Sequence, residues 1–156
     1  MTGLQSLADT TAAALESFET TLRSIQDAHL HQADPDGGWT VAQIVSHMHL
    51  SGLLVIADFE RLRHHDHLFM FREELGHDVL GALPHSAEEA ANRIASLRVA
   101  LAECLPAADP AVLAKSVEVP PFGKMSMATL APGLVGHIAS HAEQARTILR
   151  KRGAIS

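Results

Sequence analysis

Two histidines lie four positions apart in the stretch GHIASHAEQ, which covers residues 136–144 and otherwise has the composition of a helix. Side chains four apart on a helix share a face, with about 5–6 Å between their Cβ atoms. At that spacing His137 and His141 can bind one metal ion together. The spacing equally suits two core side chains that hydrogen-bond to backbone carbonyls, so the pair alone leaves both interpretations open.

A third histidine, His47, lies on the predicted inward face of an earlier helix, a face that Ile44 and Leu54 define. Neighbouring helices in a bundle bring such faces together, so the three imidazoles can converge. A buried ring nitrogen without a partner costs about 1–3 kcal/mol, and one divalent cation would satisfy all three rings. We therefore predict a metal site made by His47, His137 and His141, with at least one coordination position open.

Gln144 shares the histidine face and can orient an imidazole from outside the ligand set, although a helix-surface amide is an equally good interpretation. Three imidazoles suit zinc, copper, iron and nickel alike. We expect Zn²⁺ or Ni²⁺, with Fe or Mn as the other candidates. No side chain is assigned a catalytic role, because the reactive group at such a site would be a water or a thiol bound to the metal.

The chain has 11 histidines, and most of the others are not placed to share this site. His49 lies two positions after His47, so on a straight helix it points about 200° away, and we expect it to pack or to make an interface contact. The segment RHHDH can bind metal adventitiously, but adjacent residues on a helix diverge, and we expect a solvated helix end. Its candidate ligands are His64, His65, Asp66 and His67.

Several catalytic motifs are missing from the sequence. Ile138 occupies the position at which an HExxH metalloprotease carries its glutamate base, so peptidase chemistry is poorly supported. Cys104 is the single cysteine and lies at the end of a predicted helix, and no serine lies in a nucleophile-elbow sequence. A nucleophilic triad is therefore not indicated.

Length and composition fit one cytoplasmic domain over residues 1–156. A single cysteine excludes an intramolecular disulfide, and the N-terminal stretch lacks the pattern of a signal peptide. The most apolar stretch, LSGLLVIADF, has ten residues, fewer than the roughly 20 that cross a bilayer, so no membrane partner is expected. Twelve Lys and Arg against 18 Asp and Glu give a net charge of −6, which disfavours nucleic-acid binding.

Helix-forming residues dominate, and apolar residues recur at three- and four-residue intervals, so the predicted fold class is all-α. The first helix is expected over residues 4–29, before a Pro/Gly turn, ADPDGG, that leads to Trp39. The second helix begins with a capping box in which Thr40 is the N-cap and Gln43 reaches back to it. This helix is apolar around much of its circumference, as a helix buried on two sides would be.

A second capping box, Ser86 with Glu89, opens the third helix, which ends at LPAADP. The last helix runs to about Arg150 and has Gly153 as its C-terminal cap. It begins near position 126 or 127, or near position 131 if Pro132 is its first residue. These four segments predict a four-helix bundle of the up-down type, with a longer connection between the second and third helices.

Three motifs follow one another along most of the chain: WTVAQIVSHM, then PPFGKMS, then HIASHAEQ. Their order and spacing resemble the DinB/YfiT-like superfamily of metalloenzymes. In that family a helix that starts with Trp and Ser or Thr carries a histidine eight residues after the Trp, and a late H-x-x-x-H pair is followed by a glutamine. The matching positions here are Trp39, Thr40, His47, His137, His141 and Gln144.

This resemblance implies a four-helix bundle, often dimeric, with a divalent ion on three histidines. It also implies chemistry with a low-molecular-weight thiol, because characterised relatives resemble isomerases and transferases that use mycothiol, glutathione or bacillithiol. We therefore expect a homodimeric, thiol-dependent transferase or isomerase that acts on a small molecule. Two alternatives stay open: a metal-dependent hydrolase, and a non-catalytic bundle whose ion only stabilises the fold.

Overall fold

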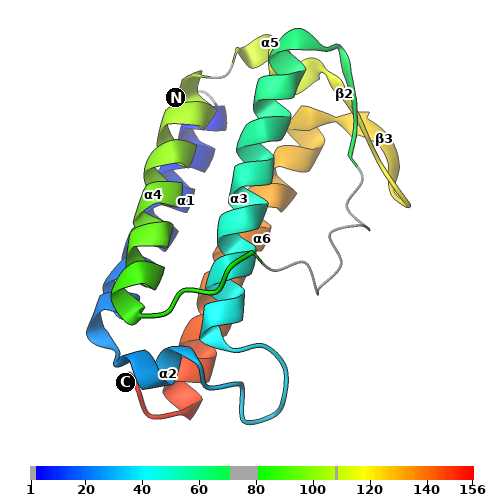
Figure 1. The fold of residues 1–156 in the computed structure, drawn as a ribbon. Coiled ribbons are helices and arrows are strands. Elements are labelled where there is room, and N and C mark those ends of the chain that lie inside the picture. The colour runs from blue at the N-terminus through cyan, green and yellow to red at the C-terminus, as the bar shows by residue number, and fades with distance from the viewer. Residues whose placement is uncertain (1–2, 71–80, 108) are drawn as a thin grey trace.

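Four long helices form a bundle in the computed structural model, which describes residues 3–70, 81–107 and 109–156 (Figure 1). They are α1 (Gly3–Ser24), α3 (Val41–His64), α4 (Ala87–Ala107) and α6 (Met127–Lys151). Both α1 and α3 pack against α4 and α6. The buried apolar side chains form one cluster, with Phe18 and Phe59 among its largest members. The predicted four-helix bundle is confirmed.

The directions of the helices determine which turns of α3 and α6 lie side by side. In Figure 1, α1 and α6 run from top to bottom, whereas α3 and α4 run from bottom to top. The long connection expected between the second and third bundle helices is present, since α3 ends at His64 and α4 begins at Ala87. Because α4 begins at the level of the start of α3, these two helices are parallel, so the order of directions departs from the strict alternation of an up-down bundle. Because α3 and α6 are antiparallel neighbours, the early turns of α3 lie beside the later turns of α6.

The first predicted helix is divided in two, which corrects the single helix expected over residues 4–29. After α1 the chain leaves the helical conformation at Gln26, which has φ −82° and ψ 151°, and a short helix, α2 (Asp27–Leu30), follows. The carboxylate of Asp27 accepts a hydrogen bond of 2.7 Å from the backbone N–H of Ala87 at the start of α4. This long-range bond favours the break, because it draws α2 across the end of the bundle.

Local capping fixes the start of α3 as predicted. The backbone N–H of Gln43 donates to Oγ1 of Thr40 at 3.1 Å, and Oε1 of Gln43 accepts from the N–H of Thr40 at 2.8 Å. At α4 the predicted capping box is only half formed. Ser86 accepts from the N–H of Glu89, but the Glu89 carboxylate accepts from the N–H of His85 instead of that of Ser86.

The last helix begins at Met127, and Ser126 caps it by accepting a 3.2 Å hydrogen bond from the N–H of Thr129. The alternative start near position 131 is therefore wrong, and Pro132 lies inside the second turn of α6. At the other end Gly153 adopts φ 69°, and Ala154 donates to the carbonyl of Leu149. This is the glycine-terminated helix end that the sequence predicts.

A small sheet and one short helix complete the described chain. The sheet has the order β1 (His67–Phe69), β2 (Ser116–Val119) and β3 (Gly123–Ser126), and α5 (Pro110–Ala114) precedes β2. β1 pairs with β2 in parallel, and β2 pairs with β3 in an antiparallel hairpin. These strands were not predicted, because runs of three or four residues are too short to show a period of two.

One described helix, α3, is long and apolar enough to cross a membrane by length and composition. Half of its most apolar window is buried inside the bundle, as in the core helix of a globular domain. Its composition is thus explained by its contacts with α4 and α6.

Candidate metal centre

Three imidazoles converge where the early turns of α3 face α6. The capping box at Thr40 fixes the first turn of α3 and so places His47 in its second turn. His137 and His141 lie one turn apart on α6. Nε2 of His137 lies 3.1 Å from Nε2 of His47 and 3.2 Å from Nε2 of His141. The sequence-predicted ligands are therefore brought together.

The separations between the ring nitrogens fit a shared cation. Two nitrogens that each lie about 2.0–2.1 Å from a tetrahedral zinc ion are about 3.3 Å apart. The observed values of 3.1 and 3.2 Å are close to that distance. One ligand atom from each histidine lies within 4.8 Å of the others. Among the described residues, these are the histidines that could hold a metal ion as a group of three.

The tautomer of His141 is set by its neighbour one turn further along α6. Oε1 of Gln144 lies 2.8 Å from Nδ1 of His141 and can only accept, so Nδ1 carries the proton. In the neutral ring Nε2 then has its lone pair free for a cation, which is the arrangement of a histidine ligand. Since Nε2 of His137 faces two other ring nitrogens and carries at most one proton, a cation suits the cluster better than hydrogen bonds among the rings.

The clustered histidines lie at the border of the core, not inside it. His47 and His141 are half-buried and His137 is exposed, whereas Ile138 and Ala145 on the same helix are completely buried. This corrects the expectation of three buried imidazoles, because the buried stripe of α6 passes to one side of His137 and His141. The desolvation cost estimated for core imidazoles therefore does not apply, and the geometry of the nitrogens carries the case for a metal.

Two further side chains contact the clustered rings. The indole of Trp39 lies 4.9 Å from the ring of His47 and 5.9 Å from that of His141, measured between centroids. The hydroxyl of Ser51, one turn after His47, lies 3.4 Å from its Nε2. The contact of Trp39 with the rings was not predicted from the sequence. The feature that could have indicated this contact is the position of Trp39 in the sequence, directly before the N-cap of the helix that carries His47.

Glu143 lies two residues after His141 on α6, but its carboxylate binds arginines. Glu143 accepts from Arg150 at 2.7 Å and from Arg146 at 3.5 Å. The hydrogen bond from Arg150, together with the charges of both arginines, holds the pKa of Glu143 below its usual value. Ile138 fills the position of the metalloprotease glutamate and is completely buried. Neither residue can act as a general base here.

The remaining candidate histidines do not join the cluster. His49 is half-buried and lies outside the group of three, and burial, followed by the charge of Arg93, lowers its pKa. The RHHDH segment is solvated, but it is only partly a helix end, because α3 stops at His64 and β1 begins at His67. The residues in it that could bind metal are all exposed. They are His64, His65, Asp66 and His67.

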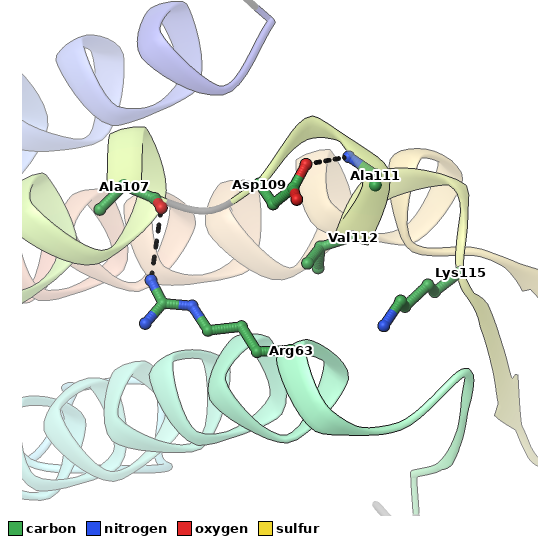
Figure 2. A pocket seen from close by; sticks show the side chains of 6 residues that line it. All are labelled: Arg63, Ala107, Asp109, Ala111, Val112 and Lys115. Carbon is green, nitrogen blue, oxygen red and sulfur yellow. Dashed lines mark hydrogen bonds between the residues drawn. The ribbon is translucent and has the colours of Figure 1, made fainter.

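A hollow of about 210 Å³ lies at the other end of α3, between that helix, α4 and α5 (Figure 2). Its two cations already have partners. Arg63 donates to the carbonyl of Ala107 at 3.4 Å, and Lys115 donates to the carbonyl of Leu62 at 2.7 Å. Both cations thus complement the carbonyl ends of helices. This hollow contains none of the predicted site residues.

The fold and the cluster define a class: helical bundles that bring one histidine of an early helix to a pair of histidines on the last. Residues 10–145 match the sequence profile of the DinB superfamily, and the chain belongs to that superfamily. Among curated proteins, none gives a significant match to this chain. The family resemblance inferred from the motifs is confirmed.

Two solved structures share the fold. YfiT from Bacillus subtilis, described as a probable metal-dependent hydrolase with an unusual four-helix bundle topology, is 17% identical and superposes with a TM-score of 0.72 over 95% of this chain and 89% of its own. A DinB-like protein from Bacillus cereus is 21% identical, with a TM-score of 0.67 over 96% of this chain and 92% of its own. At these identities the likeness establishes the fold.

Proposed function

We propose that this protein is a metal-dependent enzyme that acts on a small molecule, with Zn²⁺ or Ni²⁺ held by His47, His137 and His141. The observation that best supports this proposal is the convergence of their ring nitrogens, within 4.8 Å of one another. Three imidazoles leave at least one coordination position for another ligand, as in catalytic zinc sites. The exposure of His137 makes the cluster accessible to a small molecule.

A cation at this site would lower the pKa of a water or thiol that binds beside the histidines. The protein's own groups hold and orient the ligands. Gln144 fixes the proton of His141 on Nδ1. The hydroxyl of Ser51, at 3.4 Å from Nε2 of His47, reaches the edge of the cluster, where it can hydrogen-bond to a polar group of the substrate.

A low-molecular-weight thiol is the proposed co-substrate. Cys104 cannot supply the thiol, because its charged neighbours are Arg63 and Glu60, near the far end of α3. Glu60 is 13 residues after His47, which corresponds to about 20 Å along a helix. Burial also raises the pKa of Cys104, so its thiol stays protonated near neutral pH. A thiol that reacts at the cluster must therefore come from outside the chain.

The protein chemistry at the cluster favours a nucleophile that ionises easily. The carboxylate of Glu143 accepts hydrogen bonds from two arginines, and Ile138 occupies the position of the metalloprotease glutamate. Neither residue can therefore take a proton from water. A thiol, with an ordinary pKa of about 8.5, needs less help than water to become a nucleophile. This supports thiol-dependent transfer or isomerisation as the leading reaction type.

Hydrolysis is the second candidate, favoured by the shared fold with YfiT, which is described as a probable metal-dependent hydrolase. In that case water takes the place of the thiol, and Ser51 and Gln144 are the neutral polar groups in contact with the clustered rings. A non-catalytic protein, in which the ion only joins α3 to α6, is the third possibility that the experiments must separate.

Metal content tests the site itself. Purified protein is expected to contain about one divalent metal ion per chain by elemental analysis, and His141→Ala is expected to abolish it. His65→Ala is the matched control, because His65 is exposed at the end of α3 and lies outside the cluster. Full metal occupancy in His141→Ala would show that the proposed site is wrong.

Cobalt substitution tests the reaction class. Thiolate bound to Co²⁺ gives a strong near-ultraviolet charge-transfer band, so a glutathione-type thiol added to the cobalt protein is expected to produce this band in wild type but not in His141→Ala. Turnover of an ester or amide substrate without any thiol would favour the hydrolase instead. If chelation lowers the melting temperature while neither ligand nor turnover is detected, the ion has a structural role.

A further inference from the structure

The single tryptophan of the chain packs directly on two of the three clustered imidazoles. Its ring plane is tilted by 58° to that of His47, with centroids 4.9 Å apart, and lies nearly parallel to that of His141, at 23° and 5.9 Å. One indole therefore contacts a candidate ligand on α3 and a candidate ligand on α6. A side chain that touches both can fix their relative orientation.

A closed loop, residues 33–40, presents Trp39 to the cluster. Ala33 and Thr40 pair across its base, and the N–H of Asp34 donates to the carbonyl of Trp39 at 3.4 Å. Gly37 and Gly38 have φ values of 92° and 112°, which residues with a side chain rarely adopt. The indole is thus carried by a turn with a defined shape.

The same loop is fastened to the end of α6. Nζ of Lys151 donates to the carboxylate of Asp34 at 3.0 Å and to that of Asp36 at 2.6 Å. Nε of Arg152 donates to the carbonyl of Ala33 at 3.0 Å. We call these two cations the α6 latch. The helix that carries His137 and His141 therefore also holds the loop that carries the indole.

We propose that Trp39 is a positioning residue of the metal centre: it fixes the ring orientations of His47 and His141 and so sets the affinity for the cation, while the α6 latch holds its loop. The proposal rests on the proposed function, since it requires that the cluster binds a cation. Its physical basis is preorganisation. A ring held in its binding orientation loses less rotational freedom when the cation binds.

The test compares Ni²⁺ affinities, measured by competition with a chromophoric chelator. Trp39→Leu removes the aromatic face and is expected to weaken binding about 10-fold to 100-fold, the usual range for groups that orient ligands. Trp39→Phe keeps an aromatic face and is expected to stay within about threefold of wild type. Phe122→Leu is the matched control, because Phe122 is 78% exposed in the turn between β2 and β3, and no change is expected.

Two further measurements distinguish a positioning role of Trp39 from a general effect of its replacement on the stability of the fold. Ni²⁺ is expected to quench the emission of Trp39 in a stoichiometric titration of wild type, because the indole lies against two of the proposed ligands, and not in His141→Ala. Lys151→Met, which removes the cation of the α6 latch that binds Asp34 and Asp36, is expected to weaken Ni²⁺ binding at low salt. Because exposed ion pairs are screened, the difference from wild type should shrink at about 1 M salt.

Equal Ni²⁺ affinities in Trp39→Leu and wild type would overturn the positioning role while leaving the metal site intact. If wild type itself binds no Ni²⁺ or Zn²⁺, the proposed function fails first, so the two failures are distinguishable. If Trp39→Leu does not fold in circular dichroism, Lys151→Met decides the matter. An affinity equal to that of wild type at low salt would then overturn the proposal.

Discussion

Gln144 accepts a hydrogen bond from Nδ1 of His141 at 2.8 Å, and Nε2 of the same ring lies 3.2 Å from Nε2 of His137. One amide thereby determines which nitrogen of His141 faces the cluster. Replacing Gln144 by Ala should leave the helix intact, because the side chain is exposed on α6, but should release the ring. We expect Gln144→Ala to weaken Zn²⁺ binding about tenfold, as measured by chelator competition.

Gln144→Glu provides the matched comparison for this prediction. A carboxylate at the same position still accepts the proton of Nδ1, so Zn²⁺ affinity should equal or exceed that of wild type. Unchanged affinity in Gln144→Ala would mean that the amide has no role in orienting His141.

Gly52 permits the close approach of α3 and α4. A Cβ atom at this position would lie 2.8 Å from Cδ2 and 3.0 Å from Cγ of Leu97, which is itself buried. We expect Gly52→Ala to lower the free energy of unfolding by about 1–3 kcal/mol through overpacking, although alanine is the better helix former by about 1 kcal/mol. Urea unfolding measures the difference.

A double-mutant cycle identifies the cause. Leu97→Ala alone should cost about 2–5 kcal/mol, and in that background Gly52→Ala should become neutral or stabilising, because the clashing atoms are gone. Simple additivity of the two changes would contradict the proposed steric contact.

Cys104 should react slowly as long as the chain is folded. It is half-buried, and burial raises its pKa, so little thiolate is present near neutral pH. We expect its reaction with a disulfide reagent at pH 7.5 to be at least about tenfold slower in native protein than in urea. Cys104→Ser provides the blank. Equal rates in the two conditions would show that the thiol is neither shielded nor raised in pKa.

The α6 latch should make stability depend on pH through Asp34. The hydrogen bond from the N–H of Asp36, followed by that from Lys151, lowers the pKa of Asp34 in the folded chain. A lowered pKa gives stability that is present above the usual aspartate value of about 3.9 and is lost as the pH falls through the folded value. Thermal melts should therefore show wild type above Asp34→Asn at pH 7, with the gap closing on acidification.

The size of that gap should fall with added salt, because Asp34, Asp36 and Lys151 form their ion pairs at the surface. A gap that persists unchanged below pH 3 would assign the effect of Asp34→Asn to something other than its charge.

Capping residues that are close together in the sequence predicted the start of α3 correctly. Thr40 and Gln43 are three residues apart, so their capping box depends on no distant contact, and it forms as expected. The break before Asp27 could not be predicted in the same way, because its partner is the N–H of Ala87, 60 positions away. For the same reason Glu89 was expected to pair with Ser86 and instead accepts from His85.

The candidate site was predictable in its membership but not in its surroundings. A spacing of four placed His137 and His141 on one face, and a histidine on another inward face supplied the third ring. Helical periodicity locates a face only to within about one residue, so it missed that these rings lie at the border of the core. The contact of Trp39 depends on a loop conformation that no periodic pattern encodes. A homodimer, a thiol partner and a cytoplasmic location stay predictions.

His47 and His137 are 90 positions apart in the chain, yet their ring nitrogens are 3.1 Å apart. A cation held between them would act as a reversible cross-link that closes a loop of more than half the polypeptide. Because the three ligands come together only in the folded chain, the cation would bind the folded form alone and stabilise it by mass action, to an extent that rises with the concentration of free metal. Since neither helix alone carries all three ligands, the centre forms only after α3 and α6 have packed together, and metal uptake would report on that one contact between helices.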